Sequence, residues 1–245
     1  MSVLHKTITF MNLKDAKILV TGGSAGIGKA TAKLLIEAGA KVAITGRDIE
    51  KLNRVAKEIG AIPVAFDVSD YEVIQAKAAE TVEALGGIDV LVNNAGIGDF
   101  PSMGDIKIEH FERVFSTNVF GLTLLTQELV KHFTEQKNGH IINIASTAAV
   151  RGFARGTVYA ASKFALRGMT ECWRAELRPH NIRVILVNPS EVTTAFANEE
   201  RIERPDEIYK LRPLEIAHTI KATLEMDDRG FIPEVTVWAT NPNRS

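Results

Sequence analysis

Tyr159 and Lys163 stand four residues apart in a stretch, 157–178, whose apolar spacing predicts a helix, so their side chains share one face. Free tyrosine has a pKa near 10, and a nearby ammonium group stabilises the phenolate and lowers that pKa. Such a pair could pass a proton to a carbonyl oxygen while hydride reaches the carbon. The same spacing is common in surface pairs, so it carries little weight alone.

Two other polar residues could act on the same oxygen or support this pair. Ser146 follows a predicted strand at 140–145, where its hydroxyl could stabilise charge that develops on a substrate oxygen. Asn118 falls inside a long helical region predicted at 107–136, in which an asparagine can also simply face solvent.

Apolar, β-branched runs alternate with helical patterns along the whole chain. The runs predict strands at 17–21, 41–45, 62–66, 88–92, 140–145, 182–187 and 234–238. Helices are predicted at 27–38, 49–59, 107–136, 157–178 and 213–226. One more helix is expected after Ser69, because Ser69 and Glu72 have the spacing of a capping box.

Strands that are apolar throughout are typical of a parallel sheet with helices on both faces. We therefore expect an α/β fold, a single doubly wound Rossmann domain with a mostly or wholly parallel seven-stranded sheet. The domain is expected to span residues 13–245, after an N-terminal extension at 1–12. Ligands of such folds bind beyond the carboxyl ends of the strands.

A glycine-rich loop lies between the first predicted strand and the first predicted helix. Glycines allow a tight turn and a close approach of the backbone to a pyrophosphate, which the unpaired amides of the following helix attract. The spacing differs from the G-x-G-x-x-G pattern, so an ordinary glycine-rich turn is the alternative. The candidate cofactor-binding residues of this loop are Gly22, Ser24, Ala25, Gly26, Ile27 and Gly28.

The end of the second predicted strand bears on the choice between NAD and NADP. NAD-selective domains usually place an acid there, but this sequence has Gly46 followed by Arg47, whose guanidinium suits a 2′-phosphate. Alternatively, Arg47 is solvated and Asp48 either caps the next helix or, if the strand ends later, binds the ribose. NADP(H) is the expected cofactor and NAD(H) the alternative.

Residues after the third and fourth predicted strands complete the candidate cofactor site. Asp67 and Val68 are placed to contact adenine, although Asp67 could simply form the turn before the next helix. The residues after the fourth strand could both tie strand ends together and line the adenosine ribose; they are Asn94, Ala95 and Gly96.

The order and spacing of these motifs closely resemble the short-chain dehydrogenase/reductase family, from Lys17 to Trp238. Ser146 precedes Tyr159 by thirteen positions, as is usual in the family. The other motifs are TGxxxGIG at 21–28, NNAG at 93–96, Asn118 in the long helix, and Tyr159-x-x-x-Lys163. The pattern looks most like bacterial 3-oxoacyl-[acyl-carrier-protein] reductases and general carbonyl or 3-hydroxy acid dehydrogenases.

The resemblance implies further roles for named residues. Lys163 should also bind the nicotinamide ribose, and Asn118 should interrupt its helix and position a water in a proton relay to Lys163. The loop expected to bind the nicotinamide carboxamide contains Pro189, Val192 and Thr193. Ser190 departs from the glycine that many relatives carry after this proline, so the backbone path of the loop is left open.

Composition narrows the function classes. The 29 basic and 30 acidic residues give a formal net charge of −1, which argues against a nucleic-acid or membrane-surface partner. The six histidines show no ligand spacing, so no metal site is expected, and Cys172 is expected to be a small buried hydrophobe. Neither a signal peptide nor a membrane span is readable, so a cytoplasmic protein is expected.

The sequence leaves the substrate open between a small carbonyl compound or hydroxy acid and a 3-oxoacyl thioester. An NAD-linked alcohol dehydrogenase and a non-catalytic dinucleotide-binding sensor are the alternatives. The charged segment 194–211 could close the pocket or be a solvated helix. An acidic acyl carrier protein, if it is a partner, needs a basic patch. Candidates for that patch are Arg151 and Arg155, with Lys131 and Lys137 as weaker ones.

Self-association is expected because the helices at 107–136 and 157–178 commonly form a dimer interface in the family, often within a tetramer. These helices carry more apolar residues than one buried face requires, although some of the residues could belong to the core. They include Phe115, Phe120, Leu124, Phe164, Leu166 and Met169. We expect a homodimer or homotetramer.

Overall fold

One seven-stranded sheet organises the protein in the computed structural model, which describes residues 11–196, 205–207 and 209–241. Its strands are β1 (Lys17–Val20), β2 (Lys41–Gly46), β3 (Ile62–Ala65), β4 (Val90–Asn93), β5 (Gly139–Ile144), β6 (Ile182–Pro189) and β7 (Glu234–Val237). The spatial order is β3-β2-β1-β4-β5-β6-β7, and every neighbouring pair is parallel, which confirms the expected sheet. The order reverses between β1 and β4, where doubly wound sheets bind ligands.

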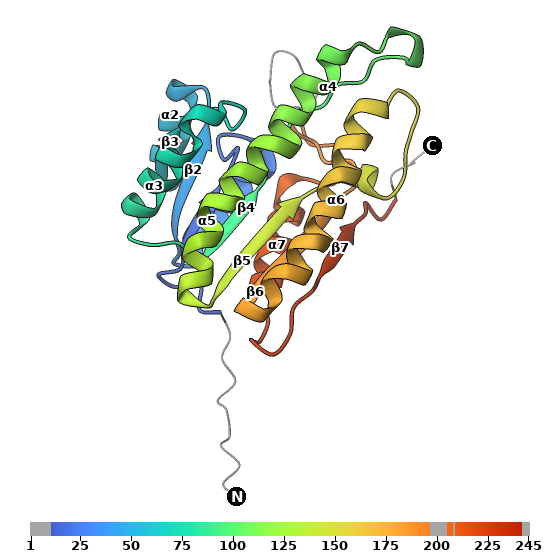
Figure 1. Cartoon of the computed structure of the whole chain (residues 1–245). Helices are drawn as coiled ribbons and strands as arrows, with labels where there is room; N and C mark the ends of the chain where they lie inside the picture. Colours follow the sequence, from blue (N-terminus) through green and yellow to red (C-terminus); the bar gives the residue numbers. More distant parts are fainter. Residues whose placement is uncertain (1–10, 197–204, 208, 242–245) are drawn as a thin grey trace, which may run out of the picture.

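Helices cover both faces of this sheet. They are α1 (Gly26–Glu37), α2 (Ile49–Ile59), α3 (Ile74–Leu85), α4 (Ile108–Phe115), α5 (Leu122–Gln136), α6 (Thr157–Leu177) and α7 (Pro213–Leu224). Apolar residues of α1, α2 and α7 pack in one core, and those of α3, α5 and α6 pack in another. Figure 1 shows α5 and α6 side by side on one face, with α7 on the other.

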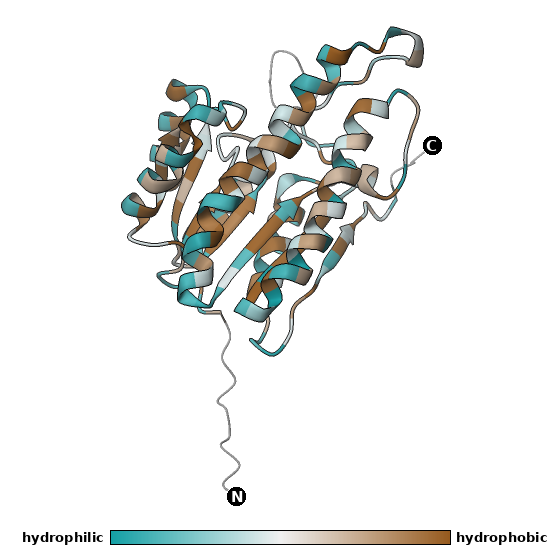
Figure 2. Ribbon diagram, viewed as in Figure 1, coloured by the Kyte–Doolittle hydropathy of each residue, from teal (hydrophilic) through white to brown (hydrophobic). Residues whose placement is uncertain are grey.

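The two cores explain why the strands are apolar throughout. Ile18 and Val20 of β1 point into the core with α1, whereas Leu19 between them points into the core with α3 and α5. The strands at the centre of the sheet are accordingly largely hydrophobic in Figure 2.

The long helical region predicted at 107–136 is interrupted. A π-helical segment, Ser116–Gly121, separates α4 from α5 and contains Asn118, so the interruption implied by the family resemblance is confirmed. Gly121 allows close packing here, because a Cβ at this position would lie 1.9 Å from the carbonyl oxygen of Val68. The segment therefore fits directly against the loop that follows β3.

Two local predictions were wrong. Ser69 does not cap a helix, because both its backbone N–H and its hydroxyl donate to Asp67 Oδ1, at 2.9 and 2.7 Å. A short 3-10 turn follows, and α3 begins only at Ile74. Cys172 is exposed rather than buried, because the inward face of α6 is formed by residues such as Thr170 and Leu177.

Parts of two predicted segments lie outside the described residues. Only residues 11 and 12 of the expected N-terminal extension are described, and residues 197–204 and 208 of the charged segment are not. In the described part of the chain, no helix combines the length and the apolar character needed to span a bilayer.

Candidate active site

Tyr159, Ser146 and Lys163 meet at the carboxyl ends of β5 and β6. Ser146 comes two residues after β5, and its hydroxyl accepts from the backbone N–H of Ala148 at 3.1 Å and hydrogen-bonds to Tyr159. The first turn of α6 presents Tyr159, and the next turn presents Lys163. The ammonium of Lys163 lies 5.7 Å from the centre of the Tyr159 ring and donates to the carbonyl of Ile144 at 3.0 Å.

Asn118 is buried beside this group and is held in a fixed orientation. Its Oδ1 accepts from the backbone N–H of Ile97 at 2.9 Å, and its Nδ2 donates to the carbonyl of Ile97 and to the hydroxyl of Ser162, at 2.9 and 3.0 Å. Gly96 leaves room where they meet, since a Cβ there would lie 3.3 Å from Asn118 Oδ1 and 3.7 Å from Lys163 Nζ. The π-helical segment thus delivers Asn118 to the same place as Lys163.

Burial determines the protonation of the two central groups. Desolvation raises the pKa of Tyr159 to about 12, against a smaller lowering by the hydrogen bond with Ser146. Desolvation also lowers the pKa of Lys163 to about 8. The expected lowering of the tyrosine pKa by the lysine is therefore not produced by the protein groups alone. The reason is that the cost of burying a charged phenolate exceeds the stabilisation from the Lys163 ammonium, which lies over the Tyr159 ring rather than at its hydroxyl.

The glycine loop is packed too tightly for side chains. Gly22 and Gly26 have φ angles of 64° and 51°, which residues with a side chain rarely adopt. A Cβ at Gly28 would lie 2.4 Å from the carbonyl oxygen of Gly22. The remaining loop residues, Ser24, Ala25 and Ile27, lead into α1, whose N-cap residue Ala25 makes no side-chain cap. This backbone cradle fits the phosphates of a dinucleotide.

The strand ends are tied together as the sequence predicted. The hydroxyl of Thr21 accepts from the backbone N–H groups of Asn94 and Ala95, both at 3.0 Å. In return, Asn94 Nδ2 donates to the carbonyls of Thr21 and Gly22, at 2.9 and 3.2 Å. The loop after β4 is thereby fixed to the glycine loop across the switch point of the sheet.

The corner after β2 holds Arg47 next to the glycine loop. Asp48 Oδ1 accepts from the backbone N–H of Lys51 at 2.9 Å, so this carboxylate caps α2. The first of the two alternatives for Asp48, a helix cap, is therefore the one observed. A Cβ at Gly46 would lie 3.2 Å from the hydroxyl of Ser24, which places Ser24 at the same corner. Arg47 is half-exposed and its Nη1 lies 3.5 Å from Asp67 Oδ2.

Asp67 forms the turn before the next helix, which was the alternative left open for it: its Oδ1 accepts from the backbone N–H of Ser69 and its carbonyl accepts from that of Asp70, at 2.9 and 3.0 Å. Although partial burial opposes it, the hydrogen bonds from Ser69 and the pairing with Arg47 lower the pKa of Asp67. Val68 beside it is buried under the π-helical segment. Asp67 thus lies beside Arg47, and contact of Asp67 and Val68 with adenine stays a prediction.

The loop after β6 reaches back to the glycine loop. A Cβ at Gly26 would lie 3.1 Å from Thr194 Cγ2. Pro189 ends β6, and Val192 and Thr193 pair with Leu211, the Thr193 amide donating to its carbonyl at 2.8 Å. The buried hydroxyl of Thr193 has no hydrogen-bond partner among the described residues, and a carboxamide would supply one. These residues therefore fit a nicotinamide dinucleotide.

Ser190 does not disturb the loop after β6, since its backbone N–H donates to the carbonyl of Val237 at 2.9 Å.

The weaker basic-patch candidates are separated from the site. Lys137 ends α5 next to the amino end of β5, and Lys131 pairs with Glu128 two turns from the same end. Arg151 and Arg155 are exposed in the segment between Ser146 and α6, on the active-site side.

Three phenylalanines near Tyr159 were missed by the sequence patterns. Their position after β4, β5 and β6, where ligands of such folds bind, was the sequence feature that could have identified them; they are Phe100, Phe153 and Phe196.

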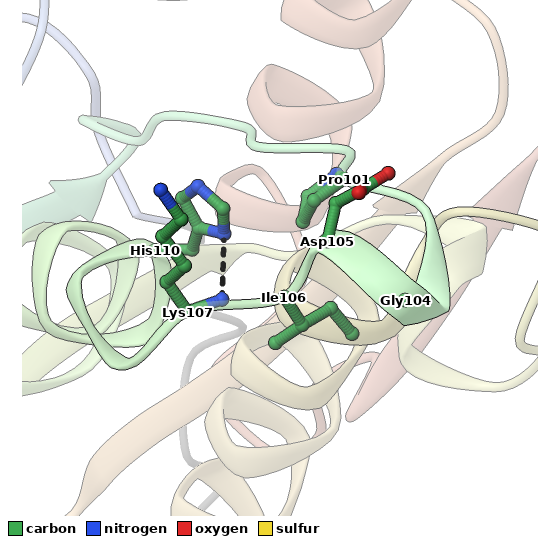
Figure 3. A pocket seen from close by; sticks show the side chains of 6 residues that line it. All are labelled: Pro101, Gly104, Asp105, Ile106, Lys107 and His110. Atoms are coloured by element: carbon green, nitrogen blue, oxygen red, sulfur yellow. Dashed lines mark hydrogen bonds between the residues drawn. The ribbon is translucent and has the colours of Figure 1, made fainter.

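Figure 3 shows a separate open hollow that contains none of the four catalytic candidates. It is lined by Pro101, Gly104, Asp105, Ile106, Lys107 and His110.

The comparison with protein families identifies the class. Residues 16–205 match the model of the short chain dehydrogenase family, so the chain belongs to that family. It is 34% identical over 191 residues to dehydrogenase/reductase SDR family member 7B of Mus musculus, a match that covers 74% of this chain and 59% of that protein. The chain thus spans about three fifths of the length of this vertebrate relative.

Bacterial relatives and solved structures match over a larger share of the chain. An uncharacterised oxidoreductase of Staphylococcus aureus is 31% identical over 228 residues, 92% of this chain and 97% of its own. A metagenomic short-chain oxidoreductase solved with NADP is 36% identical with a TM-score of 0.80, covering 94% and 99% of the two chains. A protein provisionally assigned as a betaketoacyl-ACP reductase is 32% identical with a TM-score of 0.78, covering 94% and 98%.

Proposed function

We propose that this protein is an NADP(H)-dependent reductase that transfers hydride between nicotinamide and a carbonyl or secondary alcohol. The observation that carries the proposal is the convergence of Tyr159, Ser146, Lys163 and Asn118 beside a glycine cradle that fits a dinucleotide.

The protein's own residues supply the proton chemistry. When bound, NADPH supplies the hydride that reaches the carbonyl carbon. Tyr159, whose raised pKa keeps its hydroxyl protonated at neutral pH, donates its proton to the substrate oxygen. Ser146 donates a second hydrogen bond to that oxygen, and Lys163, still largely protonated at pH 7, balances the negative charge that forms on the phenolate. Asn118 holds the loop after β4 beside Lys163 by accepting a hydrogen bond from the backbone N–H of Ile97.

Replacing Tyr159 tests this chemistry. Tyr159→Phe keeps the ring contacts with Phe100 and Phe196 but removes the proton donor, so kcat should fall by about 10²–10⁴-fold. The dissociation constant of NADPH should stay within about twofold, because the hydroxyl is not needed for the phosphates. Absorbance at 340 nm and calorimetric titration measure the two quantities. Tight NADPH binding by the natural protein without turnover of any carbonyl would instead favour a dinucleotide sensor.

The preference for NADP over NAD is inferred from the corner after β2. Arg47 is half-exposed beside the Ser24 hydroxyl, Gly46 takes the place of the usual acid, and the metagenomic relative was solved with NADP. The pairing with Asp67 holds the guanidinium there, and a 2′-phosphate would find both a cation and a hydroxyl.

Arg47→Ala should weaken NADPH binding by roughly 10- to 100-fold, the range of a lost charge-assisted hydrogen bond. NADH binding should change little, because NADH lacks the phosphate. Arg54→Ala, which removes an exposed arginine from the adjacent helix α2, is the matched control and should leave both affinities unchanged. A natural protein that binds NADH as tightly as NADPH would support the NAD-linked alternative.

A second candidate substrate class is a 3-oxoacyl thioester. The relative assigned as a betaketoacyl-ACP reductase favours it, and so do the exposed guanidinium groups of Arg151 and Arg155 on the active-site side. If an acidic acyl carrier protein docks there, Arg151→Glu should raise the KM for the carrier-bound substrate without raising the KM for a small ketone.

A further inference from the structure

Aromatic rings surround the side chain that donates the proton. The ring of Phe100 lies 5.5 Å and that of Phe196 lies 5.4 Å from the ring of Tyr159, measured between centroids. Phe153 lies 6.1 Å from Phe100. All three pairs are tilted by 44° to 58°, so the cluster presents both ring faces and ring edges. Aromatic rings bind other aromatic rings in such geometries.

The rings are held in this position by the backbone around them. A Cβ at Gly98 would lie 2.7 Å from Phe100 and 3.0 Å from Phe196, so these two rings converge over a glycine. The Phe153 ring covers Gly156 in the same way, at 2.7 Å. Glycine at 98 and 156 thus creates the space that the rings occupy.

Two of the rings remain open to solvent although Tyr159 beneath them is buried. Phe153 is 50% exposed and Phe196 is 39% exposed, whereas Tyr159 is 8% exposed. Folding alone gives no reason to keep large apolar rings in water, and apolar surface gathered at one place commonly marks a binding site. The exposed ring of Phe196 thus packs directly against the ring of Tyr159, and that of Phe153 packs against Phe100.

Two of the charged groups next to the rings make contacts within the protein. Asp99, adjacent to Phe100, pairs with Arg113. The Nε of Arg155 donates to the carbonyl of Phe100 at 3.0 Å and fixes that segment. The groups that pack directly against the Tyr159 ring are the apolar rings of Phe100 and Phe196, which suit an uncharged aromatic ring.

We propose that the substrate of this site carries an aromatic ring next to its carbonyl group, as in aryl ketones, and that Phe100, Phe153 and Phe196 bind the ring. This inference rests on the proposed reductase function, because it assigns the ring to the space beside the Tyr159 hydroxyl. Aliphatic ketones of similar bulk are reduced less well, since they cannot stack on the three rings.

Three ketones test the proposal in the natural protein with NADPH: acetophenone, cyclohexyl methyl ketone of similar bulk, and butanone. Phe153→Ala and Phe196→Ala should each lower the ratio of kcat/KM for acetophenone to kcat/KM for butanone by about 10-fold. Leu214→Ala is the control, an apolar residue 41% exposed on α7, and it should leave the ratio of the two substrates unchanged.

Equal losses for acetophenone and cyclohexyl methyl ketone, or an unchanged ratio in both variants, overturn the aromatic assignment. A binding measurement separates this failure from failure of the proposed function. Calorimetric titration of acetophenone into Tyr159→Phe with NADPH requires no turnover, and Phe153→Ala in that background should weaken binding. If acetophenone binding depends on Phe153 but the natural protein does not reduce acetophenone, the reductase function is refuted and the aromatic site is kept. If acetophenone binding does not depend on Phe153, the aromatic site is refuted.

Discussion

Burial shifts the pKa values of Tyr159 and Lys163 in directions that suit carbonyl reduction. A pKa of about 12 keeps the tyrosine a proton donor at neutral pH, and a pKa of about 8 leaves the lysine mostly charged. Abstraction of a proton from an alcohol requires the phenolate, which the protein groups alone disfavour. We therefore expect alcohol oxidation to need a higher pH than carbonyl reduction.

His140 is a third buried titratable residue, near the amino end of β5. Its Nε2 lies 3.3 Å from Arg183 Nη1, and because guanidinium only donates, the imidazole must accept and stay neutral. Burial, and to a lesser degree the charge of Arg183, lowers the pKa of His140 to about 4. Arg183 in turn pairs with Asp228 at 2.9 Å.

This lowered pKa makes stability depend on pH. Below the ordinary histidine pKa of 6.5 the unfolded chain binds a proton that the folded protein does not, so the free energy of unfolding falls as pH falls from about 7 towards 4. The loss from His140 should be about 2 kcal/mol at pH 5. Urea unfolding of the natural protein and of His140→Gln at pH 7.5 and 5 measures it. Parallel losses in the two proteins would contradict the assignment to His140.

At the scale of elements, close backbone approaches position the site. The glycine loop touches the end of β4 through Gly28 and Asn94, and the π-helical segment touches the loop after β3 through Gly121. Each contact brings a helix terminus or a bulge to the carboxyl edge of the sheet. A side chain at either glycine would force the two elements apart.

Gly28→Ala should therefore weaken dinucleotide binding by about 10-fold or more, because the new methyl group would lie 2.4 Å from the Gly22 carbonyl and 2.5 Å from Asn94 Nδ2. Gly168→Ala, in the exposed part of α6 with no atom within 4 Å of the new methyl group, is the matched control. It should keep NADPH affinity and raise the unfolding free energy by about 0.4–1 kcal/mol. Calorimetric titration and thermal unfolding check both, and equal NADPH affinities in the two variants would contradict the packing argument.

At the scale of the whole molecule, α6 and α5 with the π-helical segment before it present an apolar outer surface. Phe120 is 50%, Leu124 36% and Phe164 47% exposed. Of the other candidates, Leu166 is buried in the monomer core, and Phe115 and Met169 are half-buried. The two helices lie next to each other, with the Thr123 hydroxyl 3.5 Å from the Met169 sulfur. Three large exposed residues on neighbouring helices favour a second copy of the chain as the partner.

Replacing Phe120 and Phe164 together by glutamate should shift the sedimentation mass from a dimer or tetramer towards a monomer, since charges are depleted from the centres of such interfaces. Leu214→Glu, at an exposed position of α7 on the opposite face of the sheet, is the control and should leave the mass unchanged. A natural protein that sediments as a monomer at micromolar concentration would contradict self-association through this surface.

The sequence by itself determined the fold class, the parallel sheet and the order of the motifs. Those features depend on local pattern, because apolar runs without alternation require helices on both faces, and glycines directly after a strand permit the tight turn into α1. It also determined that Tyr159 and Lys163 share a helix face, since that follows from their spacing alone.

Only the tertiary structure decided the environment of those residues. The raised pKa of Tyr159, the use of the Ser69 hydroxyl by Asp67, the exposure of Cys172 and the ring cluster at Tyr159 all depend on which distant segments meet. Phe100 and Phe196 are 96 residues apart in the chain, yet both rings contact Tyr159. Desolvation and ring contacts are properties of packing, and no spacing in the sequence encodes them.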